Sequence, residues 1–562
     1  METGFVDALV VCGATSVSHL IGSKPAIPEN PSTENKIERE WKMPDLSKRE
    51  VLFASLAAAI GLQAGAEAKA SDKESPPQDG ALGAIPGPFN SSVASLETYR
   101  TPDWFRDAKF GIWSHWGPQA VPGQGDWYAR FLYVPGHPHY DYHVKTFGHP
   151  SEFGYKDIIP LWKAERFDPE ALMTKYAAAG AKYFVSMGVH HDNFDLWNSR
   201  HHRWNAAAMG PKRDIVGAWK AAAKRHGLRF GVSEHLGASY CWWYPNHLYD
   251  QFWPKLGVNY DGADPRYADL YHDNRDQPYL NKSGTWYTTN AKFQRHWFDR
   301  ISDLIDSYQP DLLYSDGGIP FGDIGRTMIA NLYNGSIARS GKLEAVYAHK
   351  NLGSGEFLPK AGIQDVERGV LDGINPLPWQ TDTSSGDWFF NDRFPHKTAR
   401  EVIGMLADIV SKNGNLLLNV VQRADGSLPP QSEELLAGLT AWMKVNSEAI
   451  HGTRPWKIFG EGPTDAKGGA FAESGDYTAQ DVRFTTKSGA LYAILLGWPQ
   501  RQSEFRSLGN QALPGARIER IDLLGGPKLQ FRRDADALRL TLPPQQGDAL
   551  MPVLRIRGHG LV

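Results

Sequence analysis

Cysteine is almost absent from this chain of 562 residues, which contains only Cys12 and Cys241. A zinc site built from paired cysteines needs several closely spaced thiols, so this class of site is excluded. Cys12 lies in a segment that we expect to be missing from the mature protein. The mature chain would then keep one cysteine and could form no internal disulfide.

A strong charge of one sign and long apolar runs are also missing. The 60 lysines and arginines nearly balance the 63 aspartates and glutamates, which gives a net charge of −3. Such a balance does not indicate a partner that is nucleic acid or an anionic membrane. An apolar run at residues 51–62 is too short to span a bilayer, and no other stretch is longer. We therefore expect neither nucleic acid nor a membrane among the partners.

The N-terminal region has the order of segments found in a bacterial signal peptide. Residues 1–42 are polar without a clear period, and we predict a non-native or disordered extension, with Met43 as the true start. Residues 43–70 contain a positive region, a short apolar region and small residues typical of a cleavage site. Residues 71–96 are rich in Ser, Pro, Gly and Ala and are predicted to form a linker. These features predict export to the periplasm or secretion.

Aromatic residues, by contrast, are abundant, with 19 Trp, 22 Tyr and 25 Phe. Flat rings fill a large core, and they also pack on the apolar faces of sugars. Core packing explains most of them, so the aromatic content alone is only compatible with sugar binding.

Strand and helix patterns alternate through residues 97–452. Apolar runs predict strands at 109–117, 181–187, 228–233, 310–316, 343–348, 362–366, 378–380 and 415–421. Capped periodic segments predict helices at 167–180, 213–227, 290–308, 396–412 and 431–450. This α/β alternation predicts a parallel sheet closed into a (β/α)8 TIM-like barrel. Two strands are weakly marked, so we expect the barrel to be irregular.

The helical pattern stops after Thr453. Residues 481–486, 491–496, 517–523, 528–531 and 538–542 are short strand-like runs separated by Gly, Pro and Asp. Residues 453–562 are therefore predicted to form a small C-terminal antiparallel β-sandwich.

Polar side chains follow successive predicted barrel strands. His115 ends the first strand, His190 and His191 follow the second, Glu234 and His235 follow the third, and Asp316 follows the fourth. Because the carboxyl ends of barrel strands meet at one mouth, we expect these groups to converge on a polyol- or metal-binding pocket. Asp316 precedes two glycines, which is compatible with a simple turn, but we predict it to be a nucleophile.

These residues resemble a known family. Residues from about 100 to 500 are similar to the retaining α-L-fucosidases of glycoside hydrolase family 29. The similar segments are residues 109–117, 126–128, 179–183, 190–192, 310–311, 315–317 and 413–419. The resemblance implies a barrel with a C-terminal β-sandwich and exo-acting hydrolysis of terminal α-L-fucosyl residues from a glycan. It implies double displacement with retention of configuration, and no cofactor or metal.

The resemblance also implies roles for individual residues. Asp316 lies at the position of the family's nucleophile. His115, His190 and His191 lie at the positions of histidines that bind the hydroxyls of fucose. Our candidates for contact with the sugar ring and its methyl group are aromatic, namely Trp127, Tyr128 and Trp388.

The second acid is less clearly marked. A retaining glycosidase needs an ionised carboxylate and a protonated carboxyl about 5–5.5 Å apart. We predict Glu367 as the general acid, because it lies at the tip of the 362–366 strand. Glu356 lies in a loop, and Glu344 precedes a strand and would be at the wrong end. Glu234, where many family members have a nearby Tyr, is expected to bind a sugar hydroxyl or to serve as the acid.

Three other functions remain open from the sequence. A metal-dependent hydrolase could use the histidines and Asp316, although zinc barrels usually carry His-x-His on the first strand. An α-galactosidase-like retaining glycosidase would also place an aspartate at the tip of the fourth strand. A sugar-binding protein that has lost catalysis is the alternative that is not an enzyme.

Overall fold

The computed structural model describes residues 82–250, 254–275, 285–464, 468–473, 477–547 and 549–562. The predicted extension, signal peptide and first part of the linker lie outside these residues. None of the described helices is both long and apolar enough to cross a membrane. Cys241 is a free, buried thiol in α9, Leu236–Trp242.

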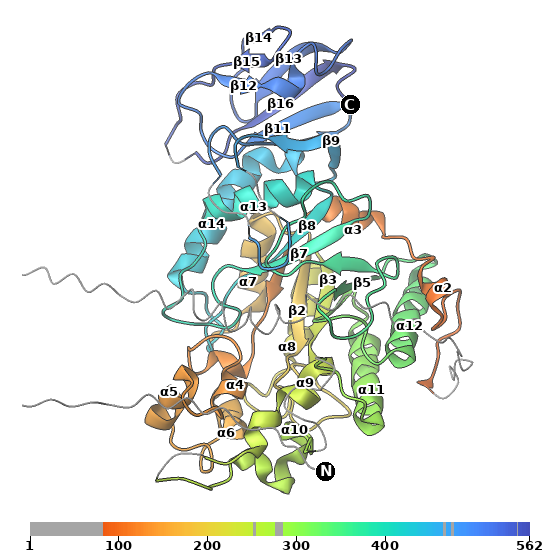
Figure 1. The fold of residues 1–562 in the computed structure, drawn as a ribbon, viewed down its shortest axis with the longest axis vertical. Helices are drawn as coiled ribbons and strands as arrows, with labels where there is room; N and C mark the ends of the chain where they lie inside the picture. The colour runs from red at the N-terminus through yellow and green to blue at the C-terminus, as the bar shows by residue number, and fades with distance from the viewer. Residues whose placement is uncertain (1–81, 251–253, 276–284, 465–467, 474–476, 548) are drawn as a thin grey trace, which may run out of the picture. The chain divides into compact units, whose positions relative to one another are not determined.

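Eight parallel strands close into a barrel in chain order, which confirms the predicted fold (Figure 1). They are β1 Phe110–Ser114, β2 Tyr183–Val189, β3 Arg229–Glu234, β4 Leu312–Ser315, β5 Val346–Lys350, β6 Ile363–Asp365, β7 Trp379–Ser384 and β8 Gly414–Asn419. The ring closes where Phe110 pairs with Leu416 and Gly111 with Leu417. Every residue of β1, β2, β4, β5, β7 and β8 is buried, as expected for strands covered on both faces.

Helices cover only part of the barrel. The main ones are α7 Pro169–Ala178, α8 Ile215–Arg225, α11 Ala291–Tyr308, α12 Asp323–Ser340, α13 Ala399–Ser411 and α14 Pro430–Asn446. Shorter helices follow β1 and β3, namely α4 Tyr128–Phe131, α5 Pro138–Thr146, α6 Tyr155–Ile158 and α10 Ala268–Tyr271. Residues 351–362 and 366–378, all of them described, contain no helix. The barrel is therefore irregular at β5, β6 and β7.

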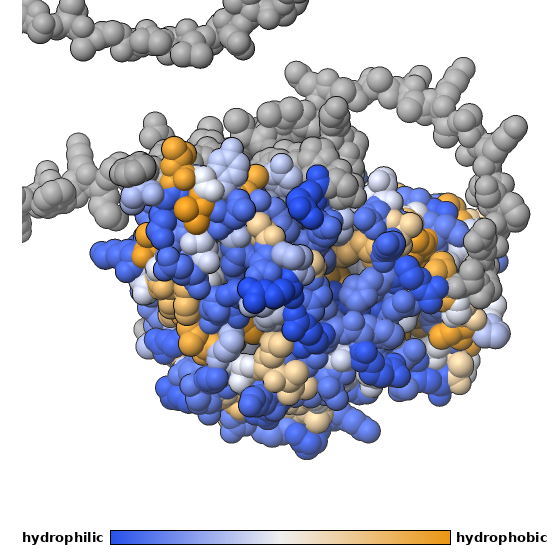
Figure 2. Space-filling view, turned by 90° about the horizontal axis from the view of Figure 1, so that it is seen from below, coloured by the Kyte–Doolittle hydropathy of each residue, from blue (hydrophilic) through white to orange (hydrophobic). Residues whose placement is uncertain are grey.

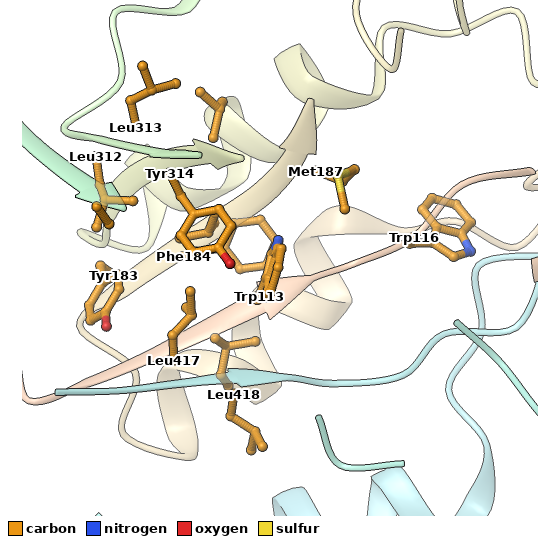
Figure 3. Close-up of a cluster of buried hydrophobic side chains, with 14 of the residues drawn as sticks. Trp113, Trp116, Tyr183, Phe184, Met187, Leu312, Leu313, Tyr314, Leu417 and Leu418 are labelled. Carbon is orange, nitrogen blue, oxygen red and sulfur yellow. The ribbon is translucent and has the colours of Figure 1, made fainter. Parts of the chain in front are cut away.

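Large apolar side chains fill the barrel (Figure 3). Trp113, Met187 and Leu417 come from different strands and are at most 1% exposed, whereas Phe184 packs outside the strands against Trp219 of α8. The Trp113 indole donates to Ser233 Oγ at 3.1 Å, so its one polar atom is satisfied inside the core. From the side that carries α5, α6 and α10, hydrophilic residues dominate and apolar ones form small separate groups (Figure 2). Most of the aromatic side chains are therefore packed in the core.

Residues 82–96 do not form the predicted linker, because they pack against α12. The amides of Ile85 and Phe89 donate to the side chains of Asn331, at 2.7 Å, and Asn334, at 3.0 Å. The short helix α2, Val93–Leu96, buries Leu96 completely. The composition resembled a linker because these residues are rich in Ser, Pro, Gly and Ala, while the asparagines that bind their backbone lie far away in the sequence.

The C-terminal domain consists of two antiparallel sheets with one apolar core between them. The five-stranded sheet contains β9 Arg454–Glu461, β10 Val482–Lys487, β11 Ala490–Leu495, β13 Arg517–Leu523 and β16 Val553–His559. The three-stranded sheet contains β12 Ser503–Phe505, β14 Phe531–Arg533 and β15 Leu538–Leu540. The predicted β-sandwich is confirmed. Strands β9, β12 and β16 were not predicted, and β14 was placed too early. β12 and β14 have only three residues each, and the longer strands β9 and β16 do not alternate regularly between buried and exposed residues.

Candidate active site

Four histidines and one aspartate meet at the carboxyl ends of β1 to β4. The His190 ring centroid lies 5.0 Å from that of His115, 4.6 Å from that of His191 and 5.0 Å from that of His235. All four histidines are at most 5% exposed. Asp316 follows β4 and contacts two of them, so the convergence expected from the strand pattern is present.

The turn after Asp316 requires glycine. Gly317 has a φ of +142°, and a Cβ at this position would lie 2.4 Å from the Tyr287 hydroxyl. The next amide, of Gly318, donates to the carbonyl of Ser354 at 2.7 Å. The β5–β6 loop therefore packs closely on this turn and fixes the backbone that carries Asp316.

Four groups surround the Asp316 carboxylate. Oδ1 lies 2.8 Å from Lys350 Nζ and accepts from the Tyr314 hydroxyl at 3.3 Å. Oδ2 lies 3.3 Å from His191 Nε2 and 3.2 Å from His235 Nδ1. The side chain is nevertheless 22% exposed, so one part of it remains accessible to a ligand.

Glu367 shares Lys350 with Asp316. Lys350 Nζ lies 2.7 Å from Glu367 Oε2 and 2.8 Å from Asp316 Oδ1. These two oxygens can therefore be no farther apart than the sum of those distances, 5.5 Å. Both carboxyls are at the mouth, on two different strands, and the Glu367 side chain is 15% exposed.

The environment separates the pKa values of the two carboxyls. Burial alone would raise the pKa of Asp316, but the Lys350 charge and then His235 and His191 outweigh it and hold that pKa well below the usual value. For Glu367, burial raises the pKa, and the charges of Asp382 and Asp316 add to it against the opposing effect of Lys350. At neutral pH Asp316 is thus ionised, and Glu367 is the carboxyl that favours a proton.

Lys350 has a third acidic partner, Asp382 on β7, whose Oδ2 lies 3.2 Å from Nζ. Burial would lower the pKa of Lys350, but the charges of Asp316, Asp382 and Glu367 raise it well above the usual value. Behind this group, burial and then the charge of Asp382 raise the pKa of Asp365. One ammonium thus lies among more carboxyls than it can neutralise, which explains why the pKa values of Glu367 and Asp365 are raised.

Hydrogen bonds orient two of the histidine rings. His191 Nδ1 bonds to the carbonyl of His235 at 2.7 Å, which turns Nε2 toward Asp316. His190 Nδ1 accepts from the Gln119 amide at 2.9 Å, so the neutral ring carries its proton on Nε2. Nε2 in turn lies 3.8 Å from Asp126 Oδ1. Burial lowers the pKa of His115, His190 and His235, so all three are neutral at pH 7.

Two of the predicted aromatic residues lie beside this cluster and one does not. The Trp388 ring lies 5.4 Å from His115, and the Trp127 ring lies 6.0 Å from His191. Tyr128 is fully buried, and its hydroxyl is 2.7 Å from His143 Nδ1, so the structure places it in the packing behind the mouth. The sequence could not separate these neighbours, because a short helix begins at Tyr128 and turns its ring away from that of Trp127.

Glu234 points away from the histidine cluster. Its Oε1 accepts from Ser315 Oγ at 2.6 Å, and its Oε2 accepts from the Trp297 indole at 3.1 Å. Burial raises its pKa to about 7, and only 1% of the residue is exposed. The structure therefore gives Glu234 a packing role behind β4, in place of the predicted contact with substrate.

The other candidate acids also have structural partners. Glu356 forms a two-pronged ion pair with Arg326 of α12, with distances of 2.5 and 2.6 Å. Glu344 pairs with Arg229 at 2.5 Å, at the amino ends of the strands and opposite the mouth. Among the candidates, only Glu367 shares a partner with Asp316.

The histidine cluster contains two groups that could hold a metal ion. They are His115, His190 and His235, and His191, His235 and Asp316, with ligand atoms within 4.8 Å of one another in each group. Nδ1 of His115 and Nε2 of His235 have no hydrogen-bond partner among the described residues, whereas Nδ1 of His235 faces Asp316 Oδ2 at 3.2 Å. Neutral imidazoles suit zinc or copper, and the same free nitrogens suit sugar hydroxyls.

Four residues that the structure places at the site were not among the predicted site residues. These residues are His235, Lys350, Asp382 and Asp126, and each of them contacts another residue of the site. His235 follows a predicted strand and was expected at the mouth with the other histidines, but no role in the site was assigned to it. Lys350 lies two residues beyond the predicted end of its strand, and the structure extends β5 to include it. Asp382 lies inside a weakly marked strand and offered no signal.

Comparisons with known proteins agree with this geometry. A family model described as alpha-L-fucosidase matches residues 81–448, and one described as the alpha-L-fucosidase C-terminal domain matches residues 475–557. Plasma alpha-L-fucosidase of Homo sapiens is 30% identical over 81% of this chain and 88% of its own length. Tissue alpha-L-fucosidase of Homo sapiens is 28% identical over 74% of this chain and 80% of its own length.

Solved structures show the same likeness. The alpha-fucosidase of Thermotoga maritima, in complex with a mechanism-based inhibitor, is 26% identical with a TM-score of 0.64. The match covers 83% of this chain and 99% of that one.

Proposed function

Because the chain belongs to the α-L-fucosidase family and is a glycoside hydrolase, we propose that it removes terminal α-L-fucosyl residues from glycans with retention of configuration. The observation that carries this proposal is the shared contact of Asp316 and Glu367 with Lys350. Their facing oxygens lie at most 5.5 Å apart, which is compatible with the ~5–5.5 Å between the carboxyl groups of retaining enzymes.

The pKa of each acid is shifted in the direction that its step requires. Asp316, held ionised, attacks the anomeric carbon and forms a covalent glycosyl ester. Glu367, whose pKa is raised by burial, gives a proton to the glycosidic oxygen as the bond to that oxygen breaks. Glu367, now ionised, then takes a proton from water, which attacks the anomeric carbon and releases Asp316. Lys350 stabilises the carboxylate of Asp316 before the attack and after the release.

The surrounding side chains support recognition of one terminal 6-deoxy sugar. Neutral nitrogens of His115, His190 and His235 can exchange hydrogen bonds with ring hydroxyls. The apolar faces of Trp127 and Trp388 suit the sugar ring and its methyl group. Because the histidines are nearly buried, the site favours a single residue at a chain end, which supports exo action.

The experiment that tests this function measures the first product by NMR. Hydrolysis of an α-L-fucoside should release α-L-fucose first, with the β anomer appearing only through later mutarotation. Initial β-L-fucose would contradict the two-step route. Parallel assays on 4-nitrophenyl α-L-fucoside and α-galactosides test the galactosidase alternative, which predicts the opposite order of activities.

We also propose, from the sequence alone, that the protein is exported. The order of charged, apolar and small residues in 43–70 supports this. Fractionation of the producing bacterium, with N-terminal sequencing of the mature protein, tests it. A mature chain that starts before Met43 would contradict the proposal.

A further inference from the structure

The C-terminal domain extends a loop to the barrel beside Glu367. This loop connects β9 and β10, and its described residues 468–473 reach the β6–β7 connection. The amide of Phe471 donates to the carbonyl of Glu367 at 2.8 Å, and that of Gly469 donates to the carbonyl of Val370 at 2.8 Å. The loop therefore occupies the side of the barrel where no helix follows β6.

Residues of both the barrel and the loop are suited to this contact. A Cβ on Gly369 would lie 2.1 Å from the Gly469 carbonyl oxygen, so only glycine permits this close approach. Glu473 accepts from the Thr383 hydroxyl of β7 and pairs with Lys397 at 3.0 Å. The loop is thus attached on both sides of Phe471, by main-chain bonds and by an ion pair.

Phe471 is exposed and strained within this attached loop. The residue is 56% exposed, although its side chain is large and apolar. Its φ of +58° lies in the left-handed region, which residues with a Cβ rarely adopt. A single exposed apolar residue is ordinary. A strained backbone is less ordinary in a residue that hydrogen-bonds to the proposed catalytic acid, because such strain concentrates at functional sites.

The neighbouring rim is also apolar. Leu352, on the loop after β5, is 44% exposed, and Phe394, on the loop after β7, is 37% exposed. These loops flank β6 on either side, so the connections around Glu367 each present a large apolar side chain. Arg368, next to Glu367, packs its guanidinium over Trp388 at 5.0 Å and so joins this rim to the aromatic wall of the sugar site.

The chemistry of the acid fixes which part of a substrate would meet this rim. Glu367 protonates the oxygen that leaves, so the sugar attached through that oxygen lies on the Glu367 side of the site. Aromatic rings pack on the apolar faces of such sugars. We propose that Phe471 forms the platform for the first sugar of the leaving group, so that the C-terminal domain contributes to the active site. This proposal rests on the proposed function.

Phe471→Asn tests it, because asparagine tolerates the left-handed backbone while it removes the ring. Two substrates are compared, α-L-fucosyl fluoride, whose leaving group is fluoride, and α-L-fucosyl-(1→2)-galactose. For the disaccharide, kcat/KM should fall about 2- to 12-fold, which corresponds to the loss of one ring contact. The value for the fluoride and the thermal unfolding midpoint should not change.

Phe471→Tyr keeps the ring and should restore the activity on the disaccharide. Leu377→Ala is the matched control, because Leu377 is 43% exposed on the same β6–β7 connection at the opposite end of the barrel. Equal losses on both substrates, or no loss on either, would overturn the platform. A wild-type protein that fails on the fluoride itself would overturn the proposed function instead, and the platform with it.

Discussion

The ε-ammonium of Lys350 lies 2.8 Å from the carboxylate of Asp316, inside a barrel where Lys350 is 2% exposed. We predict that Lys350→Met raises the pKa of Asp316, because the carboxylate loses its closest cation while its burial remains. The acidic limb of kcat/KM should move up by about 1–3 pH units, the range for loss of an adjacent opposite charge.

A pH–rate profile measures this shift. Lys350→Arg keeps the positive charge and should recover most of the acidic limb. Lys360→Met, which changes an exposed lysine of the same β5–β6 loop, is the control. An acidic limb that stays in place in Lys350→Met would show that Lys350 does not control the ionisation of Asp316.

Asp316→Gly should lower kcat by on the order of 10⁴-fold or more, because the residue that forms the covalent intermediate is removed. Added azide should restore turnover and yield the β-fucosyl azide, since azide attacks directly from the vacated side. NMR and mass spectrometry identify this product. Asp392→Asn, at an exposed aspartate, should behave like the wild type. A fully active Asp316→Gly protein would eliminate the nucleophile assignment.

Glu367→Gln should impair poor leaving groups far more than good ones. Loss of a general acid lowers rates by about 10²–10⁴-fold, and this matters only when the leaving oxygen needs a proton. In the wild type the raised pKa of Glu367 sets the alkaline limb, since activity falls as pH rises through that pKa and the proton is lost. The variant should lack this limb.

Glu234→Gln and Glu356→Gln are controls for the acid, because each replaces a carboxylate with structural partners. Neither should show dependence on the leaving group. If Glu234→Gln shows it and Glu367→Gln does not, the assignment of the acid is wrong. Fucosyl oligosaccharides and α-L-fucosyl fluoride provide the two classes of leaving group.

Asp408→Ala should lower the free energy of unfolding by about 3–5 kcal/mol. Asp408, on α13, lies 2.8 Å from Lys412 and 2.6 Å from Arg483 of β10, and all three are at most 2% exposed. The substitution leaves two buried cations without a carboxylate, one of them at the contact between the barrel and the C-terminal domain. Urea unfolding measures the change.

The matched control is Glu170→Gln, which breaks an exposed pair with Arg225. An exposed pair contributes about 0–1 kcal/mol, so this variant should stay close to the wild type. Equal losses in the two variants would show that burial of the Asp408 network does not matter.

Chelators should not lower activity, whereas added Zn²⁺ should inhibit it reversibly and in competition with fucose. The neutral nitrogens of His115, His190 and His235 can bind either a metal or sugar hydroxyls, so the two compete. Steady-state inhibition kinetics with and without EDTA measure this. Activity that is lost on chelation and restored by Zn²⁺ would instead favour a metal-dependent hydrolase.

Much of this protein follows from local sequence. Buried apolar runs separated by capped helices specified the barrel, because strand and helix periods are local properties. Asp316 and the histidines were marked because each directly follows such a run. The position of Glu367 at a strand tip was sufficient to select it, although its role stays a prediction.

Tertiary structure decided the partnerships between distant groups. Lys350 joins Asp316, Glu367 and Asp382 only because three strands bring them to one point, and no pattern along the chain records that meeting. The neighbours Trp127 and Tyr128 have opposite surroundings, and Glu234 is turned behind its own strand. Sequence thus determined which backbone elements form, since that depends on neighbouring residues. Only the folded barrel set the charges and contacts of the site, because electrostatic fields and packing act through space.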